Sequence, residues 1–257
     1  MAIRTTAIVN LKGGVAKTTT AINLAAILAK DHGKRVLLID ADSQCNTTEF
    51  FSAQPSADTM ATILRDASLY DCPEAIAILA IQPTAYEGLH LIPGDESLMD
   101  LDLSAASQGT ADVNILRSLV EIVQDKYDYI LIDCPPAFNA ASAAALVAAD
   151  DVIIPIKLDA FSLRGMANLM RQIKNMRKIN PRLRIAGLLP TMWYKDPQIQ
   201  KAEAQLKEAG MNVFQHIRRS DKVDSMTFRQ EPLLVSSPNS AAGVDYRKFV
   251  AEYMGGV

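Results

Sequence analysis

The chain has 257 residues, of which 49% are hydrophobic and 21% are charged, and this balance excludes disordered, collagen-like and coiled-coil proteins. The N-terminal residues lack the pattern of a signal peptide, and no apolar run approaches the roughly 18 residues of a membrane span. The net charge of −3 conceals a segregation, because residues 38–163 carry 20 acidic and 4 basic side chains, whereas residues 164–222 carry 4 acidic and 13 basic ones. We therefore expect a cytoplasmic protein with no membrane partner, in which a local basic region can still bind an anionic polymer.

Short, β-branched apolar runs alternate with longer helical patterns along the chain. Residues 7–10 predict a buried strand, and residues 18–30, followed by Gly33, predict the first helix. Further buried runs predict strands at 36–40, 129–133, 152–156, 185–189 and 213–217. Strands that alternate with helices indicate an α/β fold with a doubly wound, mostly parallel sheet and helices on both faces. No repeat or linker is visible, so we expect a single domain over residues 1–257.

A glycine-containing segment, NLKGGVAKTTT at residues 10–20, connects the first predicted strand to the first predicted helix. A phosphate chain is bound by converging backbone N–H groups, a positive helix N-terminus, a lysine, and a hydroxyl that ligates Mg²⁺. Gly13 and Gly14 allow the backbone to approach closely, Lys17 supplies the charge and Thr18 the hydroxyl. The segment therefore predicts a phosphate-binding loop.

This loop departs from the general P-loop pattern, G-x-x-x-x-G-K-[ST], which would place glycines where Leu11 and Ala16 stand. A methyl group at residue 16 is compatible with such a loop only if the backbone stays clear of positive φ. Taken alone, the segment would favour a strand–helix turn with incidental lysines.

Three motifs in order, however, resemble those of the ParA/MinD family of deviant Walker A ATPases. KGGVAKTT at residues 12–19 resembles the family's K-G-G-x-x-K-[ST]-[ST]. DADSQ at residues 40–44, with Thr48, is similar to D-x-D-P-Q-x-x-x-T, although Ser43 replaces the proline. YILIDCPP at residues 129–136 resembles the Walker B strand and its D-x-P-P. The resemblance implies a P-loop NTPase-like fold that binds ATP and Mg²⁺.

The resemblance also implies catalytic roles. Lys17 matches the general phosphate lysine, and Lys12 matches the signature lysine, which in the family reaches the partner's phosphates in a nucleotide-sandwiched dimer. An extra cation there offsets charge that builds up during phosphoryl transfer. Asp42 matches the carboxylate that positions the attacking water. The catalytic residues are thus expected to be Lys12, Lys17 and Asp42.

Metal and nucleotide contacts follow from the same motifs. Thr18 matches the Mg²⁺ ligand, and Asp133 matches the Walker B carboxylate, which usually holds Mg²⁺ through water. Asp40 is expected to support the water shell of the metal or Lys17, with a helix cap as the alternative. The residues expected to bind the nucleotide are Lys12, Gly13, Gly14, Val15, Ala16, Lys17, Thr18 and Thr19. The adenine is expected between the loops that follow residues 189 and 217.

Several branches of the family fit the chain poorly. The three cysteines, Cys45, Cys72 and Cys134, have no C-x-x-C spacing. They also lack the setting of the cysteine pair that the iron–sulfur relatives carry at the dimer axis. We therefore expect no disulfide, zinc or iron–sulfur site, and a reducing compartment. The C-terminal segment DYRKFVAEYMGGV is too short and too weakly basic for a MinD membrane helix. The same segment also lacks the tyrosine cluster that bacterial tyrosine kinases of the family carry. The chain is most similar to short, Soj-type ParA partition ATPases.

A basic stripe gives an independent indication of a polyanionic partner. Residues 161–180 predict an amphipathic helix whose apolar face consists of Leu163, Met166, Leu169, Met170, Ile173 and Met176. Its basic face carries Arg164, Arg171, Lys174 and Lys178. Arg219 and Lys222 stand where Soj-like proteins have I-P-R-x-x-R, with Arg218 in place of the proline. These cations can bind DNA phosphates without reading sequence, and ordinary solvated surface charges are the alternative.

The combined reading is a weak ATPase that forms a homodimer around Mg²⁺-ATP. The dimer is expected to bind DNA non-specifically, because doubling the contacts raises avidity, and to be nucleoid-associated in the ATP-bound state. Hydrolysis, stimulated by a ParB-like centromere-binding protein, would release the DNA and so drive plasmid or chromosome partition. Two alternatives stay open: a similar ATPase that positions a protein cargo without DNA, and a nucleotide-binding regulator with negligible hydrolysis.

Overall fold

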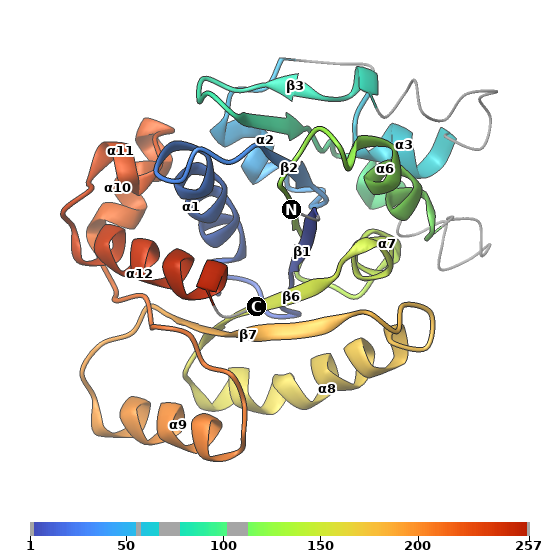
Figure 1. The fold of residues 1–257 in the computed structure, drawn as a ribbon. Coiled ribbons are helices and arrows are strands. Elements are labelled where there is room, and N and C mark those ends of the chain that lie inside the picture. The colour runs from blue at the N-terminus through green and yellow to red at the C-terminus, as the bar shows by residue number, and fades with distance from the viewer. Residues whose placement is uncertain (1–2, 55–57, 67–77, 102–112, 256–257) are drawn as a thin grey trace.

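A computed structural model describes residues 3–54, 58–66, 78–101 and 113–255. Within these residues, seven strands form one sheet in the order β3-β4-β2-β5-β1-β6-β7 (Figure 1). The strands are β1 (Arg4–Ile8), β2 (Val36–Asp40), β3 (Gln82–Pro83), β4 (Leu89–Ile92), β5 (Tyr129–Asp133), β6 (Asp151–Lys157) and β7 (Arg184–Thr191). All neighbouring strands are parallel except β3, which runs antiparallel to β4. The predicted mostly parallel sheet is thereby confirmed.

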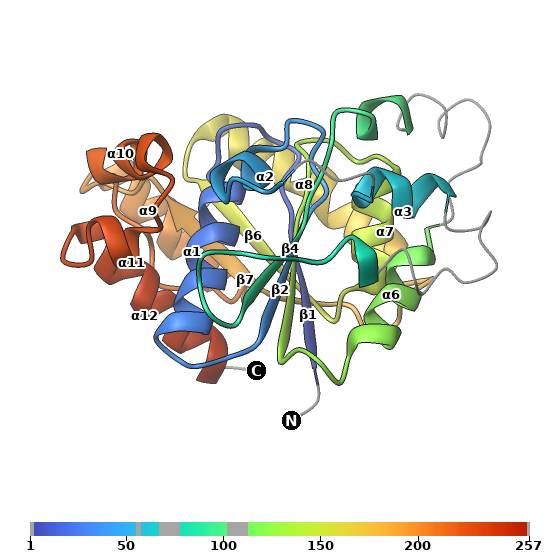
Figure 2. The same cartoon turned by 90° about the horizontal axis from the view of Figure 1, so that it is seen from above.

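Helices cover both faces of this sheet, as two perpendicular views show (Figures 1 and 2). One core cluster places α1, α10, α11 and α12 on one face, and a second places α3, α6, α7, α8 and α9 on the other. The helices are α1 (Lys17–Lys30), α2 (Asn46–Phe50), α3 (Met60–Asp66), α6 (Ile115–Val123), α7 (Ala140–Ala148), α8 (Ala160–Met176), α9 (Pro197–Glu208), α10 (Asp221–Arg229), α11 (Leu233–Ser236) and α12 (Ala241–Gly255). None of the described helices is long and apolar enough to cross a bilayer.

The central strands are apolar on both sides because each side meets a layer of helices. In β2, Leu37 and Ile39 pack in the cluster of α6 and α7, whereas Leu38 packs in the cluster of α1 and α12. All three side chains are fully buried. Alternation of side chains along a strand thus explains why these segments read as continuous apolar runs.

Side-chain caps set the starts of the helices that follow the sheet. At the start of α7, the side chain of Asn139 accepts a hydrogen bond from the N–H of Ser142. At the start of α8, the side chain of Asp159 accepts one from the N–H of Ser162, and Ser220 caps α10 in the same way. Asp196 caps α9, which has Pro197 in its first turn. Each cap satisfies an N–H group that has no partner inside its helix.

Three predicted elements differ in extent. The first strand spans residues 4–8 rather than 7–10. The N–H of Val9 still donates to the carbonyl of Ile153 in β6, and the side chain of Asn10 donates to the carbonyl of Pro155. Residues 213–217 do not form a strand: Val213 makes one isolated bridge to Leu188 of β7, and a second bridge joins Arg218 to Trp193, beyond both segments. The helix predicted at 161–180 ends at Met176, and the buried side chain of Asn180 instead binds two carbonyl groups of α7 and its C-cap.

The described cysteines, Cys45 and Cys134, are free thiols, while Cys72 lies outside the described residues.

Candidate functional site

Two carboxylates meet at the carboxyl end of the sheet. Asp40 ends β2 and Asp133 ends β5, and the two residues are register partners. Asp133 is also paired with Ile8, so the loop that leaves β1 begins beside both acidic groups. Both carboxylates are buried. The edge of a parallel sheet where ligands bind therefore carries a concentrated negative charge in this protein.

The loop between β1 and α1 turns through two left-handed residues. Gly14 has φ 69°, and Ala16, the N-cap of α1, has φ 66° and ψ 37°. The condition for accommodating the methyl group of Ala16, a backbone clear of positive φ, is therefore not met. The carbonyl of Ala16 accepts from Thr20 and starts the helix, and this geometry persists at a cost of about 1 kcal/mol for a residue with a Cβ. The N-terminus of α1 consequently points into the site.

Lys17 lies below the loop as a buried cation. Its Nζ donates to the carbonyl oxygen of Lys12 at 3.2 Å. Burial lowers the pKa of Lys17 below its ordinary value, while the carboxylates of Asp133 and Asp42 act in the opposite direction. An anion beside Lys17 would complete the charge balance of this region.

Lys12, the other lysine of the loop, binds to the start of α8. Its Nζ lies 3.0 Å from both carboxylate oxygens of Asp159 and 2.9 Å from Oγ of Ser162. Burial works to raise the pKa of Asp159, but the hydrogen bonds from Ser162 and Lys12 outweigh it and lower the pKa to about 2. Lys12 is thus held by an ion pair at the rim of the site.

Asp133 combines burial with an unused oxygen. The hydroxyl of Thr47 donates to its Oδ2 at 2.8 Å, whereas its Oδ1 is buried without a hydrogen-bond partner in the described part of the chain. Burial raises the pKa of Asp133, and the charge of Asp40 raises it further. The hydroxyl of Thr18 and Asp133 are oxygen ligands of the kind that Mg²⁺ prefers, directly or through water.

This donor set fits a Mg²⁺ ion that also takes ligands from phosphate and water. No group of three or more His, Cys, Asp or Glu side chains among the described residues could hold a metal by itself. A hydrated ion bound through one hydroxyl and one carboxylate needs no such group.

Asp40 performs a different task from Asp133. Its Oδ2 accepts from the N–H and the hydroxyl of Thr48, at 2.8 and 2.6 Å, and its Oδ1 accepts from the N–H of Asp42 at 3.2 Å. A Cβ on Gly94 would lie 2.9 Å from the carbonyl oxygen of Asp40, so only glycine fits beside it. Burial raises the pKa of Asp40, and the Thr48 hydrogen bonds counteract part of this rise. Asp40 therefore fixes the segment that carries Asp42.

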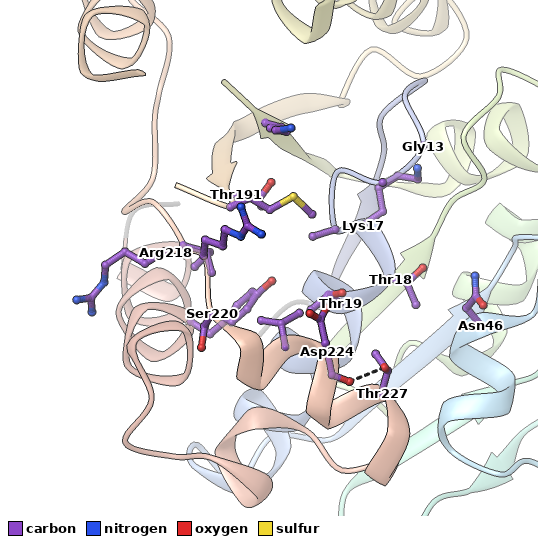
Figure 3. A pocket seen from close by; sticks show the side chains of 18 of the residues that line it. Gly13, Lys17, Thr18, Thr19, Asn46, Thr191, Arg218, Ser220, Asp224 and Thr227 are labelled. Atoms are coloured by element: carbon purple, nitrogen blue, oxygen red, sulfur yellow. Dashed lines mark hydrogen bonds between the residues drawn. The ribbon is translucent and has the colours of Figure 1, made fainter. Parts of the chain in front are cut away.

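Asp42 faces an open cavity of about 850 Å³. Its Oδ1 accepts from the N–H of Gln44 at 3.1 Å, which leaves Oδ2 without a partner in the described residues. Figure 3 shows Lys17 and Thr18 on one side of the cavity and Arg218 and Ser220 on another, with Thr19 beside Asp224. The part of the lining that comes from the loop and the strand ends is Gly13, Gly14, Ala16, Lys17, Thr18, Thr19, Asp42, Gln44, Asn46 and Pro136.

The opposite wall follows β7 and precedes α10. Thr191, Met192 and Tyr194 line it together with residues 217–221, and Met192 has φ 52°. The hydroxyl of Thr191 donates to the carbonyl of Val15 at 3.1 Å and so joins this wall to the phosphate-binding loop. The cavity reaches the two loops where the sequence places the adenine.

The basic residues predicted to bind DNA occupy two places. Arg164 and Arg171 are exposed on α8, with side-chain hydrogen bonds only within their own helix. Arg219 and Lys222 are exposed at the start of α10. Arg218, in contrast, binds the buried Asp245 of α12, and both Arg218 and Arg219 line the cavity. The structure therefore does not place all five cations on one surface.

Several residues of the site had no recognisable sequence signal. Thr47 contacts Asp133 from 86 positions away in the chain, and Asp159 contacts Lys12 from 147 positions away. Asp245 contacts Arg218 across 27 positions. Asp159 carries one local indication, because aspartate is among the residues preferred at the N-cap of a helix. Its pairing with Lys12 depends on the fold.

Comparisons with known proteins agree with this geometry. A family model described as an AAA domain matches residues 3–185. The chromosome partitioning protein ParA of Caulobacter vibrioides is 35% identical, covering 97% of this chain and 93% of the relative. The chromosome-partitioning ATPase Soj of Thermus thermophilus is 33% identical, covering 98% and 96%. An ATP complex of a McdA variant from Cyanothece superposes with a TM-score of 0.83 at 26% identity, covering 99% of this chain and 97% of that one. The chain belongs to the ParA family of ATPases.

Proposed function

We propose that this protein is a partition ATPase that binds Mg²⁺-ATP, forms a homodimer around the nucleotide and binds DNA non-specifically in that state. Hydrolysis is slow in isolation and is stimulated by a ParB-like centromere-binding protein, after which the DNA is released. The observation that supports this most directly is the cavity, where a lysine, a helix N-terminus and a carboxylate surround one space. These are the groups that phosphoryl transfer requires.

The loop residues 12–19 bind the triphosphate in this proposal. Their backbone N–H groups lie at the positive end of α1, which stabilises anions, and Lys17 neutralises the phosphate oxygens. Thr18 and Asp133 hold Mg²⁺, which when bound offsets the charge of the phosphates. Asp40 acts indirectly, because its hydrogen bonds to Thr48 and Asp42 fix the segment between them.

Hydrolysis depends on a carboxylate that can accept a hydrogen bond from water. Asp42 has this property, since it lines the cavity with one carboxylate oxygen unpaired in the described residues. Lys12 supplies a further cation to the phosphates of the second subunit. A cation at this place stabilises charge that develops in the transition state.

DNA binding is assigned to the exposed cations of α8, chiefly Arg164 and Arg171, with Arg219 and Lys222 as a second group. Their guanidinium and ammonium groups face solvent and are not buried in ion pairs. Contacts of this kind give affinity that falls steeply with salt and does not depend on sequence. Dimerisation doubles the number of such contacts on one polymer.

Filter binding of labelled DNA tests the proposal, with and without ATP, at about 50 mM and about 200 mM salt. We expect retention only with ATP and Mg²⁺, and a loss of retention at the higher salt. DNA retention that ignores ATP contradicts the proposed switch. ATP-dependent dimers that retain no DNA at low salt would favour an ATPase that positions a protein cargo.

A further inference from the structure

Asn23 is a fully buried polar side chain on α1, the helix that follows the phosphate-binding loop. Its Nδ2 donates to the carbonyl oxygen of Thr19 at 2.8 Å and to Sδ of Met226 at 3.4 Å. Its Oδ1 accepts from the N–H of Leu233 at 2.9 Å. Both N–H groups and the carbonyl oxygen of the amide therefore have a partner, which fixes its orientation. One side chain thus joins α1 to α10 and α11.

The helix α10 has few other attachments to the body of the protein. Met226 is its one fully buried residue in the described chain, and Val223 packs against the same core cluster while only partly buried. Beyond the end of the helix, the side chain of Gln230 donates to the carbonyl oxygen of Glu49 at 2.8 Å, on the exposed surface. The contact between Asn23 and Met226 is consequently the inner attachment of α10.

This helix forms a wall of the nucleotide cavity. Asp224 and Thr227 line the cavity together with Thr19, and Figure 3 shows Thr19 beside Asp224. Met226 lies between the two wall residues in the same helix, and Asn23 lies one turn after Thr19 on α1. Because the phosphates occupy the loop in the proposed function, the wall of α10 is left to the nucleoside. The distance between α1 and α10 therefore sets the width of the nucleoside part of the cavity.

We propose that Asn23 is a positioning residue that fixes α10 relative to the phosphate-binding loop and thereby determines the affinity for the nucleoside part of the nucleotide. The inference rests on the proposed function for the place of the phosphates. A wall that is already in place costs little to order when a ligand binds, whereas a mobile wall subtracts the cost of its ordering from the affinity. The loop amides and Lys17 do not depend on α10, so the grip on the phosphates is independent of this contact.

Two variants test the proposal at different depths. Asn23→Ala removes all three hydrogen bonds, whereas Met226→Leu removes only the sulfur acceptor and keeps the apolar volume of the core. Calorimetry compares a non-hydrolysable ATP analogue with inorganic tripolyphosphate, each with Mg²⁺. We expect Asn23→Ala to bind the analogue about three- to tenfold more weakly than the wild type, and Met226→Leu to change in the same direction. Tripolyphosphate should bind all three proteins equally. Equal losses for both ligands, or no loss for the analogue, overturn the proposal.

Asn180→Ala is the matched control, because Asn180 is also a buried asparagine that donates to two carbonyl groups, those of Leu146 and Ala149. It packs on the other face of the sheet and does not line the cavity. Urea denaturation should show that both asparagine variants are less stable than the wild type, while only Asn23→Ala loses affinity for the analogue. A comparable loss of affinity in Asn180→Ala would show that stability rather than position matters, and would overturn the inference.

Amide hydrogen exchange separates this inference from the proposed function, because it needs no nucleotide. Mass spectrometry follows exchange in α10, with α6 as the internal reference. We expect several-fold faster exchange in α10 of Asn23→Ala and Met226→Leu than of the wild type, and unchanged exchange in α6. Equal rates in α10 overturn the inference. A wild type that binds the analogue no more tightly than tripolyphosphate contradicts the nucleotide placement of the proposed function, while the exchange rates still decide whether Asn23 anchors α10.

Discussion

Arg218 forms a two-pronged ion pair with Asp245. Its Nε and Nη2 each donate to one carboxylate oxygen at 2.8 Å, and its backbone N–H donates to the same carboxylate at 3.0 Å. Asp245 is buried on α12, whereas Arg218 lines the cavity. The pair thus joins the far wall of the site to the helical layer. A side chain held in this way contributes to the fold before it contributes to any external contact.

We expect Arg218→Ala to lower the free energy of unfolding by about 1 to 3 kcal/mol, because the buried carboxylate of Asp245 loses its charged donors. Urea denaturation measures this change. Arg219→Ala is the matched control, since the Arg219 side chain has no hydrogen bond or ion pair among the described residues. Equal losses of stability in the two variants would show that the ion pair is not structurally important.

Asp42→Ala is expected to bind ATP, dimerise and stay on DNA without turnover. The reason is that Asp42 lines the cavity through an oxygen available to water, whereas Lys17 and the loop amides remain unchanged. Removal of a water-positioning group typically costs a factor of about 10² or more in rate. Phosphate-release kinetics check the prediction, and a normal rate of hydrolysis would rule out this role for Asp42.

Lys12→Ala is expected to bind nucleotide with little change, because Lys17 and the backbone of the loop supply the main phosphate contacts. It should neither dimerise nor hydrolyse ATP efficiently, since it lacks the cation proposed to reach the second subunit. A fluorescent ATP analogue measures binding, and size exclusion with ATP measures dimerisation. Lys126→Ala, at an exposed lysine remote from the cavity, serves as control. ATP-dependent dimers of Lys12→Ala would contradict the proposed role.

Asp133→Asn is expected to stabilise the nucleotide-free protein at pH 8 while abolishing Mg²⁺-dependent hydrolysis. Burial and the charge of Asp40 raise the pKa of Asp133, so ionisation of this carboxyl disfavours the folded state. Below about pH 4 the Asp133 carboxyl is protonated in both the folded and the unfolded protein, and its contribution to stability is complete. This contribution is lost as the pH rises through the raised pKa of the folded protein. The variant should therefore gain about 1 to 2 kcal/mol over the wild type at pH 8, with the gain shrinking toward pH 4.

Asp128→Asn gives the opposite sign in the same measurement. Asp128 lies at the start of β5 and accepts from Arg35, whose hydrogen bonds lower the pKa of this carboxyl. The Asp128 carboxylate stabilises the fold at pH values above the pKa that it has in the unfolded chain, and this contribution is lost on acidification. Asp128→Asn should therefore be less stable than the wild type at pH 8. Denaturant titrations between about pH 4 and pH 8 compare the two variants. A parallel response of both would contradict the assigned shifts.

Arg164→Ala and Arg171→Ala are expected to weaken ATP-dependent DNA binding for every sequence alike. Each lost phosphate contact should reduce the slope of log affinity against log salt by about 0.9 per subunit. Binding of fluorescent duplexes at several salt concentrations measures this slope. Lys126→Ala removes one exposed charge from the turn between α6 and β5 and is expected to leave the slope unchanged. An unaltered slope in both arginine variants would exclude α8 as the DNA-binding surface.

The sheet and the phosphate-binding loop could be predicted from the sequence because their signals are local. The runs at 36–40 and 129–133 are apolar on both faces and end in aspartate, and the structure places β2 and β5 at the same bounds. The loop lies at the N-terminus of α1 as expected. The apolar face of α8 is also as predicted, with Leu169 and Ile173 buried. Periodicity and strand length were sufficient for these elements.

The rest depends on contacts between distant parts of the chain. The segment at 213–217 has the composition of a strand, but it pairs with β7 only at the single bridge between Val213 and Leu188. The conformation of Ala16 is decided by the turn that α1 requires, which outweighs the preference of a residue with a Cβ. The pairing of Lys12 with Asp159 and of Arg218 with Asp245 cannot be read from spacing. Side-chain geometry at the site is thus a property of the fold.

The uneven charge along the chain becomes uneven charge in space. The basic residues 164–222 include α8, β7 and α9 at one end of the sheet, while β3, β4 and α3 at the other end belong to the acidic residues 38–163 (Figure 1). Such a molecule has a permanent dipole moment, so the field of a polyanion exerts a torque on it before contact. Encounters are thereby biased toward approach by the end that carries α8, and this rotational steering weakens as added salt shortens the range of the field.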